Sequence, residues 1–220
     1  MPKIKNQRYR QFVKSGLIDI ISRDEFIGLL THIKAPRGEG NNANWMAQAR
    51  AAIILLFYSG RRPCEIVALN AEDIKIDTNL IRIMFKTAKG GRVSLINLPI
   101  NPITQEVLNL CEGKFPTTRL FYSFLPLGGG RKNTVHWKTI KGETKTKEYR
   151  RTSDRLGRYC TKWFDFPCYV FRHNRFSDMA EKGASFLEIA HMKGATDVDS
   201  VKPYMHLSSA RAKDLVKYLE

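Results

Sequence analysis

Residues 45–65 read WMAQARAAIILLFYSGRRPCE, and this stretch decides the fold. The run 45–58 is almost entirely apolar or alanine, which predicts a helix that is buried on most of its sides. Gly60 is expected to end this helix, because glycine commonly follows a helix C-terminus. Pro63 suits the first turn of a short helix that continues to about Leu69. The sequence therefore predicts a core helix that leads directly into a polar corner with two adjacent arginines.

Two capping boxes mark the beginnings of further helices. Ser22 and Glu25 precede an apolar-periodic run to Ile33, and Ser185 and Glu188 begin a helix that ends at Gly194. Composition predicts the remaining helices at 102–110, 147–163, 171–182 and 210–219. Proline, glycine and asparagine are typical of loops, which we expect at 34–44 and 115–133.

One pair of strands is predicted in the middle of the chain. Leu80 to Lys86 alternates between apolar and polar residues, and Arg92 to Leu98 follows a glycine-containing turn, which is typical of an antiparallel hairpin. No internal repeat or shift in composition divides the chain. We therefore predict an α+β, predominantly helical domain over residues 21–220, preceded by a basic N-terminal arm at 1–20.

The charge of the chain points to a polyanion as partner. The sequence has 37 Lys and Arg against 21 Asp and Glu, a net charge of +16, and half of this excess lies between residues 128 and 162. Aromatic residues are interleaved there with basic ones, as in surfaces that follow phosphates. A solvated basic surface without a partner is the alternative. The expected nucleic-acid contacts are Lys89, Arg131, Lys132, Lys138, Lys141, Arg150, Arg151 and Arg155.

Several other classes of protein are excluded by the sequence. No apolar run approaches the roughly 18 residues that a membrane span needs, and no secretory signal is visible. The four cysteines form no C-x-x-C pair, which predicts a reducing compartment and no zinc site. No Walker A or H-E-x-x-H motif occurs. We expect a cytoplasmic protein, in the host cytoplasm or nucleoid, that needs no metal, ATP or other cofactor.

Four motifs follow one another along the chain. The segment 59–65 reads SGRRPCE, Lys86 ends a strand before a turn, 169–173 reads YVFRH, and KGA at 193–195 is followed by a tyrosine at 204. This order and spacing resemble the tyrosine recombinase (integrase) family over the chain from about residue 20 to the C-terminus. The resemblance implies the catalytic-domain fold of that family, with a small antiparallel β-element.

The resemblance also implies a set of catalytic residues. The family's T-G-L-R-x-x-E matches 59–65, so the first arginine is Arg62. The family lysine stands eight residues before the proline of V-P-L, which implies Lys86, with Lys89 as the alternative. H-x-x-R-H matches 169–173 and makes Arg172 the second arginine. The nucleophile lies nine residues after the histidine of G-H, which implies Tyr204.

The chemistry of these residue types agrees with strand exchange in DNA. A phosphodiester exchange without metal needs a nucleophile, a clamp for the charged phosphorane and an acid for the leaving oxygen. Two arginines form an always-protonated, planar clamp, and a lysine beside a turn can protonate the leaving 5′-oxygen. A tyrosine forms a 3′-phosphotyrosine, which conserves the bond energy for rejoining.

Two positions depart from the family pattern. Tyr169 replaces the histidine before the second arginine, and Ala195 replaces the histidine after the glycine. A tyrosine with a reference pKa near 10 is a poor base, so Tyr169 is expected to donate a hydrogen bond to phosphate. The alternative is that its ring only packs beside Phe171 or Trp163. A tyrosine here resembles archaeal viral and plasmid integrases, and an inactive descendant stays open.

Four further residues are expected to support the site. Glu65 either orients Arg62 or favours the N-terminus of its helix, and His173 is expected to buttress the site without taking part in the chemistry. His191 and His206 lie near the nucleophile in sequence.

We predict site-specific recombination or integration by a mobile-element recombinase that acts on double-stranded DNA in a tetrameric synapse. No separate core-binding domain is expected ahead of the catalytic domain. A topoisomerase-IB-like enzyme and a catalytically dead architectural DNA-binding protein are the alternatives.

Overall fold

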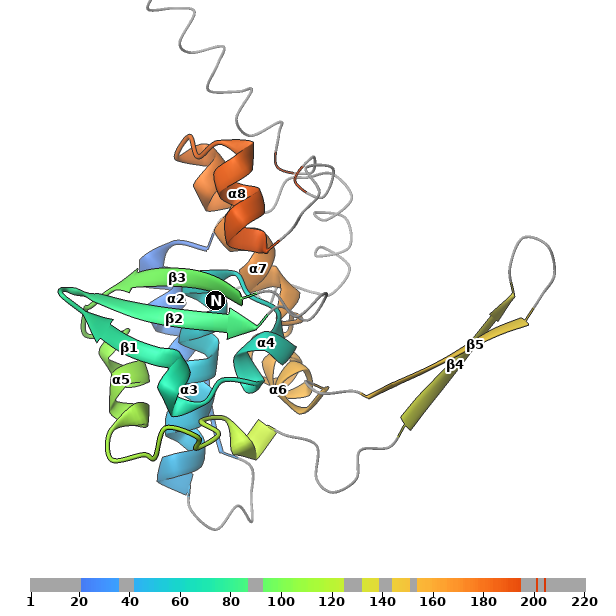
Figure 1. Cartoon of the computed structure of the whole chain (residues 1–220), viewed down its shortest axis with the longest axis horizontal. Coiled ribbons are helices and arrows are strands. Elements are labelled where there is room, and N and C mark those ends of the chain that lie inside the picture. The colour runs from blue at the N-terminus through green and yellow to red at the C-terminus, as the bar shows by residue number, and fades with distance from the viewer. Residues whose placement is uncertain are drawn as a thin grey trace, which may run out of the picture.

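The computed structural model describes residues 21–35, 42–86, 93–124, 132–138, 144–150, 154–194, 201 and 204 (Figure 1). Its α-helices are α2 (Arg23–Leu30), α3 (Asn42–Ser59), α4 (Pro63–Val67), α5 (Gln105–Cys111), α6 (Asp154–Phe164), α7 (Tyr169–Glu181) and α8 (Phe186–Lys193). Two 3-10 turns lie at Ala71–Asp73 and Tyr122–Phe124. No helix in these ranges is long and apolar enough to cross a membrane.

Helix α3 is the centre of the core. Its residues 51–56 are fully buried, as the apolar sequence predicts, and the helix contacts α4, α5, α7 and the strand β3 (Val93–Pro99). Phe26 of α2 stacks on Phe57 of α3 with 3.8 Å between ring centroids. Burial of this many large side chains against one helix accounts for most of the stabilisation of the domain.

A three-stranded antiparallel sheet covers α3 on one side (Figure 1). Its order is β1 (Ile74–Asp77), β2 (Leu80–Lys86) and β3. Every second residue of β2 and β3 is buried, and Phe85 pairs with Ser94 on the buried face. The predicted hairpin is confirmed, whereas β1 was not predicted because only four residues form it.

A second hairpin corrects two predictions. Strands β4 (Lys132–Lys138) and β5 (Thr144–Arg150) pair along their full length, where the sequence predicts a loop to residue 133 and a helix from 147. The period-two signal of a half-buried strand is short here, because β4 alternates only at Val135 and Trp137 and β5 consists mostly of Lys and Thr. Cross-strand backbone hydrogen bonds hold this segment, and the helix begins only at Asp154.

Two helix boundaries also differ from the predictions. Helix α5 begins at Gln105 and not at Pro102, because the Asn101 side chain accepts hydrogen bonds from the backbone N–H groups of Ile103 and Thr104, at 2.9 and 3.1 Å. Helix α7 begins two residues before the predicted start. The predicted helix at 210–219 and the arm at 1–20 lie outside the described residues.

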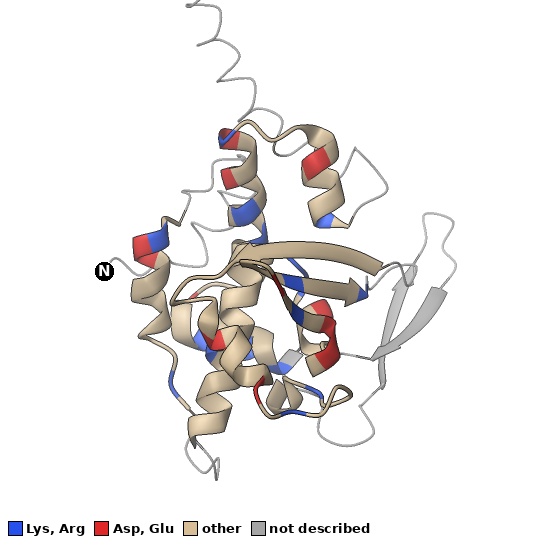
Figure 2. Ribbon diagram, turned by 60° about the vertical axis from the view of Figure 1, so that its left-hand side comes forward, with Lys and Arg blue, Asp and Glu red and all other residues tan. Residues whose placement is uncertain are grey.

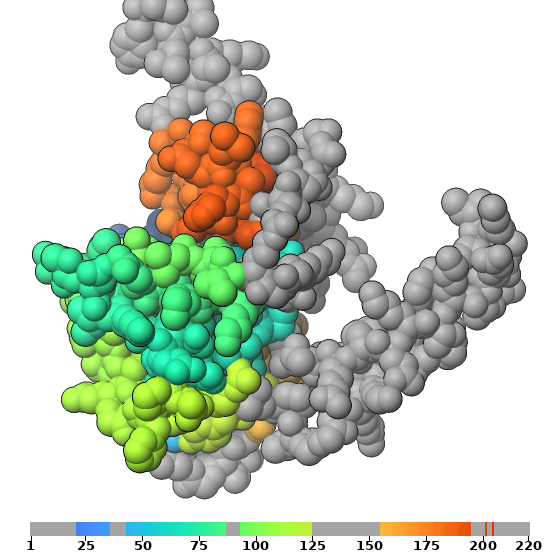
Figure 3. Space-filling view, viewed as in Figure 1, coloured from blue at the N-terminus to red at the C-terminus, as the bar shows by residue number. Residues whose placement is uncertain are grey.

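Helices α7 and α8 stand above the sheet (Figure 3, orange above green). A second apolar cluster holds them together, and its buried members are Phe176, Ala180, Ile189, Ala190, Val201 and Tyr204. Met192 of α8 packs against both this cluster and the main core. Helix α7 also contacts α3. The C-terminal part of the described chain is thus fixed over the end of the core helix.

Candidate active site

The corner between α3 and α4 brings the first arginine motif to the site. Ser59 Oγ donates to the carbonyl oxygen of Leu55 at 2.5 Å and accepts from the backbone N–H of Arg61 at 3.2 Å. Gly60 turns the chain with φ of +61°, a conformation that favours glycine. The serine and the glycine together end the helix and aim the next residues away from its axis.

Gly60 also allows α7 to approach this corner. A Cβ atom at Gly60 would lie 3.1 Å from Phe176 Cζ and 3.2 Å from Arg175 Cβ. Its carbonyl oxygen accepts a hydrogen bond of 2.5 Å from Arg172 Nη1. Position 60 therefore requires glycine for two reasons: the backbone is left-handed there, and α7 approaches too closely for a side chain.

We expect Gly60→Ala to destabilise the fold more than Gly113→Ala does. Both glycines have positive φ, at +61° and +67°, but no atom lies within 4 Å of a Cβ built at Gly113. Backbone strain should cost each variant about 1–2 kcal/mol, and Gly60→Ala should lose more because α7 must shift. Urea unfolding of the two variants measures the difference, and equal losses would refute the packing argument.

Arg62 is held by a carboxylate in the same turn. Its Nη1 lies 3.1 Å from Glu65 Oε1, and its backbone N–H donates to Glu65 Oε2 at 3.0 Å. The Arg62 side chain is 26% exposed, whereas that of Glu65 is 1% exposed. Glu65 thus contacts the guanidinium and also satisfies the first backbone N–H at the start of α4, so both of its predicted interactions are present.

Arg172 is buried between two carbonyl groups. Its Nη1 donates to Gly60, and its Nη2 donates at 3.0 Å to the carbonyl oxygen of Lys193, the last residue of α8. The guanidinium also lies over the ring of Phe176, 4.9 Å from the centroid. A helix C-terminus carries partial negative charge, so this position suits a cation. The two bonds fix the plane of the guanidinium.

The electrostatics of Arg172 identify its charged neighbours. Burial, with a smaller effect of the positive charge of Arg62, lowers the pKa of Arg172 to about 10, whereas Glu65 and Tyr204 act in the opposite sense. This pKa is still well above neutral pH, so the guanidinium keeps its charge. Arg62, Glu65 and Tyr204 are therefore all close enough to act on Arg172, although 142 positions separate the first from the last.

Tyr204 lies in the same place. It is 4% exposed, and its ring packs edge-on against Phe176 with 5.7 Å between centroids. The hydroxyl oxygen lies 2.8 Å from Nδ1 of His173, the residue after Arg172. Lys193 Nζ lies 5.5 Å from the centre of the tyrosine ring. The structure thus brings Tyr204 to Arg172 and His173 within one chain.

The two other predicted catalytic residues are exposed, and among the described residues no hydrogen bond or ion pair joins either of them to the two site arginines or to Tyr204. Lys86 is exposed at the end of β2, where it pairs with Val93, and Tyr169 is 46% exposed at the start of α7. Figure 2 shows basic positions, in blue, on α7 and at the end of β2. Among the described residues, no ring contact joins Tyr169 to Phe171 or Trp163, which instead pack against Phe164.

One charged residue beside the site was not singled out in the sequence. Arg61 is fully buried, donates from Nη2 to Ser94 Oγ and lies 5.3 Å from the centre of the Phe85 ring. It therefore connects the corner that carries Arg62 to the hairpin that carries Lys86. Only its place next to Arg62 could have drawn attention to it, because hydropathy predicts that an arginine is exposed.

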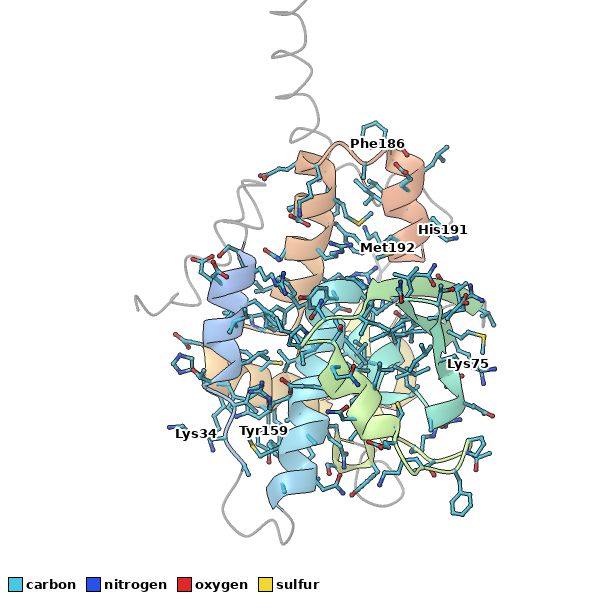
Figure 4. The ribbon with its side chains drawn as sticks, turned by 90° about the vertical axis from the view of Figure 1, so that its left-hand side faces the viewer. Lys34, Lys75, Tyr159, Phe186, His191 and Met192 are labelled. Atoms are coloured by element: carbon cyan, nitrogen blue, oxygen red, sulfur yellow. The ribbon has the colours of Figure 1, made fainter. Side chains whose placement is uncertain are left out.

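The remaining predicted residues are spread widely. His191 lies on the outer side of α8 and is exposed, while its neighbour Met192 turns towards α7 (Figure 4). Arg155 is half-buried at the start of α6. Lys132 and Lys138 are in β4 and Arg150 is in β5. His206, Ala195, Lys89, Arg131, Lys141 and Arg151 lie outside the described residues.

The described part of the chain lacks the clustered side chains that bind metal ions. It contains no group of three or more His, Cys, Asp or Glu side chains that could hold an ion. The site is instead composed of two guanidinium groups, a phenol and an imidazole. Such a set can bind an anionic phosphate, supply an oxygen nucleophile and accept a proton.

Comparison with solved structures identifies the fold. The XerH site-specific recombinase, solved with its difH substrate before cleavage, superposes with a TM-score of 0.56 at 14% identity, over 97% of this chain and 53% of that one. The XerA recombinase gives a TM-score of 0.55 at 14% identity, over 92% of this chain and 64% of that one. The α+β, predominantly helical fold is therefore that of a tyrosine recombinase catalytic domain, as predicted.

Sequence comparison identifies the family. A tyrosine recombinase of Thermosipho africanus is 25% identical over 221 residues, covering 100% of this chain and 66% of the relative. XerD of Oceanobacillus iheyensis is 23% identical over 201 residues, covering 90% of this chain and 61% of the relative. The chain thus spans less than two thirds of the length of these relatives. The family model for the phage integrase family matches residues 27–211, well over half of the sequence, so the chain belongs to this family.

Proposed function

We propose that this chain carries the catalytic activity of a site-specific tyrosine recombinase, which cleaves and rejoins DNA strands through a 3′-phosphotyrosine intermediate. One observation supports this most strongly. Arg62 and Tyr204, implied as catalytic by motifs far apart in the sequence, both act electrostatically on the third implied residue, Arg172. Burial of a charged arginine is costly, so a basic protein without such a site is not expected to bury an arginine and a tyrosine together beside a second arginine.

In this proposal Arg62 and Arg172 bind the non-bridging oxygens of the scissile phosphate. Each guanidinium has five N–H donors. Arg172 donates to two carbonyl groups, so N–H groups are left on both Arg62 and Arg172 to bind the phosphate. Tyr204 attacks phosphorus, and Lys86 protonates the 5′-oxygen that leaves. Because Tyr204 contacts His173 of its own chain, delivery of the nucleophile in cis is favoured.

Tyr169 is proposed to donate a hydrogen bond to the same phosphate. We expect Tyr169→Phe to slow single-turnover cleavage by about 10–100-fold, equivalent to roughly 1.4–2.7 kcal/mol of transition-state stabilisation. Tyr122→Phe is the matched control, because Tyr122 is 50% exposed, close to the exposure of Tyr169, and the substitution removes the same hydroxyl group. A Tyr169→Phe enzyme as fast as wild type would rule out this role.

The β4–β5 hairpin is proposed as part of the DNA-binding surface. Lys132 pairs with Arg150, and Lys138 pairs with Thr144. Since strand positions alternate between faces, the register puts the positions of Lys132, Lys138 and Arg150 on one face. Basic positions on one face of a ribbon suit contact with a phosphate backbone, and Arg155 follows the hairpin on α6.

The biological setting proposed here is recombination of double-stranded DNA by several copies of the chain in a tetrameric synapse, in the host cytoplasm. XerH was solved on its target site, and the FLP recombinase in a complex with a Holliday junction, which supports DNA as the substrate. The tyrosine at position 169 supports an origin in an archaeal mobile element, while the relatives named above are bacterial.

The decisive experiment offers the protein two labelled duplexes that carry a candidate attachment site, and a supercoiled plasmid that carries one copy. A recombinase exchanges strands between the duplexes through a four-way junction. Relaxation of the plasmid without exchange would favour the topoisomerase-like alternative. Binding without any covalent protein–DNA adduct would show an architectural protein and end the proposal.

A further inference from the structure

His173 makes a contact that its position in the sequence does not suggest. Its Nδ1 lies 2.8 Å from the hydroxyl oxygen of Tyr204, 31 positions further along the chain. The two rings are tilted by 40° with 6.0 Å between centroids. The distance is that of an ordinary hydrogen bond between a hydroxyl group and an imidazole nitrogen. Of the described side chains, His173 is therefore placed against the atom that would attack phosphorus.

The charge and tautomer of His173 set the direction of this hydrogen bond. Burial lowers the pKa of His173 below the usual 6.5, and the positive charges of Lys193, on α8, and Arg172, on α7, lower it further. The imidazole is therefore neutral at pH 7. A neutral imidazole accepts through its unprotonated nitrogen, so with the proton on Nε2 the tyrosine hydroxyl donates to Nδ1.

We propose that His173 is a catalytic residue, the general base that takes the proton of the Tyr204 hydroxyl as that oxygen attacks the phosphate. The inference rests on the proposed role of Tyr204 as nucleophile. The O–H bond of Tyr204 breaks as the new O–P bond forms, and its proton moves to Nδ1. The bond between phosphorus and the 5′-oxygen breaks, and Lys86 protonates that oxygen. In rejoining, the 5′-hydroxyl gives its proton to Lys86 as it attacks phosphorus, the bond between phosphorus and the tyrosine oxygen breaks, and that oxygen recovers its proton from His173.

The other candidates for this role are less suited to it. Tyr169 is an exposed phenol at the start of α7, and a group with a reference pKa near 10 binds a proton too tightly to act as a base at neutral pH. Position 195, a histidine in the family pattern, is alanine. Histidine, whose ordinary pKa lies near 6.5, is the side chain best suited to act as a general base near neutral pH.

Burial of Tyr204 adds to the need for such a base. Only 4% of the residue is exposed, so bulk water has little access to its hydroxyl group. A phenol at pH 7 is almost entirely protonated, whereas the attacking species needs electron density on oxygen. Nearby Arg172 and Lys193 stabilise the phenolate that forms as the proton leaves.

The test replaces His173 by asparagine and measures single-turnover cleavage of a nicked suicide duplex. Asparagine keeps a hydrogen-bond acceptor close to the position of Nδ1 but cannot take up a proton at neutral pH. We expect His173→Asn to cleave about 10²–10⁴-fold more slowly at pH 7, the usual contribution of a general base. The deficit should shrink as the pH rises, because solvent then ionises the tyrosine. His32→Asn, at an exposed histidine, is the matched control.

The wild-type enzyme provides a second measurement that needs no variant. Its cleavage rate should fall as the pH drops through a single inflection below 6.5, the side to which the pKa of His173 is displaced, and this inflection should be missing in His173→Asn. An Asn variant that cleaves within threefold of wild type with the same pH profile would show that His173 only holds the tyrosine. A wild-type rate that shows no inflection on the acid side of pH 6.5 would also overturn the inference.

Failure of the proposed function gives a different result. If wild type forms no covalent adduct, or forms it through a residue other than Tyr204, the recombinase assignment of that tyrosine is wrong. If the adduct is on Tyr204 but wild type shows no acid-side inflection, or His173→Asn keeps the wild-type rate and pH profile, the assignment of Tyr204 stands and His173 is not the base. Equal DNA affinity and equal melting temperature of the two asparagine variants exclude a folding defect as the cause.

Discussion

Tyr204→Phe should bind DNA as well as wild type does and form no covalent protein–DNA adduct. The ring packs against Phe176 in an apolar cluster, and phenylalanine fills the same space, so the fold should be retained. The variant loses the only atom that can bond to phosphorus at this position, so the expected loss is complete. Denaturing gels with a nicked suicide duplex detect the adduct.

Tyr122→Phe is the control for the general effect of removing a hydroxyl group. It lies in the turn Tyr122–Phe124 and should leave the amount of adduct unchanged. An adduct that persists in Tyr204→Phe would transfer the role of nucleophile to Tyr169, Tyr159 or Tyr122. Of these, Tyr159 packs in an aromatic group with Trp45 and Trp163, which leaves Tyr169 and Tyr122 as the exposed alternatives.

Arg172→Lys should slow cleavage by about 10²–10³-fold although the charge is kept, an effect comparable to the loss of one preorganised donor in an oxyanion site. Lysine is a point charge and cannot present two parallel N–H groups to a phosphate. Its single nitrogen also cannot occupy the positions of both Nη1 and Nη2, which donate to Gly60 and Lys193 and fix the orientation of the arginine. Single-turnover rates at saturating protein measure the effect.

Arg175→Lys is the matched control on the same helix. Arg175 pairs with Asp178 at 3.3 Å. Only its Cβ and Cγ lie beside Gly60, and lysine keeps both of these atoms, so this variant should cleave at a rate close to that of wild type. Near-normal cleavage by Arg172→Lys would contradict the clamp. A similar loss in both variants would point to a general disturbance of α7.

The corner at 59–65 shows how much of the site was readable in the sequence. An apolar run, a glycine and a proline predicted a buried helix, its end and a second helix, and α3 and α4 confirm this order. The choice of Arg62 over Arg61 as the site arginine came from motif spacing. In the structure Arg62 is partly exposed beside Glu65 while Arg61 is fully buried, which favours Arg62, and its role in the site stays a prediction.

Contacts between distant segments were not readable. The hydrogen bond from Tyr204 to His173 depends on how α8 returns the chain to α7, which no local pattern encodes. The β4–β5 hairpin was missed because its apolar alternation is confined to Val135 and Trp137, too short a pattern to predict a strand pair. Arg61 was missed because burial of a charged side chain under a sheet runs against hydropathy.

The most direct test of the central claim is the identity of the residue that becomes attached to DNA. The protein is trapped on a nicked suicide duplex, the DNA is trimmed with nuclease, and the modified peptide is sequenced by mass spectrometry. We expect a 3′-phosphonucleotide on Tyr204 and no modified peptide from the Tyr204→Phe protein. A nucleotide attached to any other residue, or cleavage that leaves no protein-bound DNA, would contradict the account.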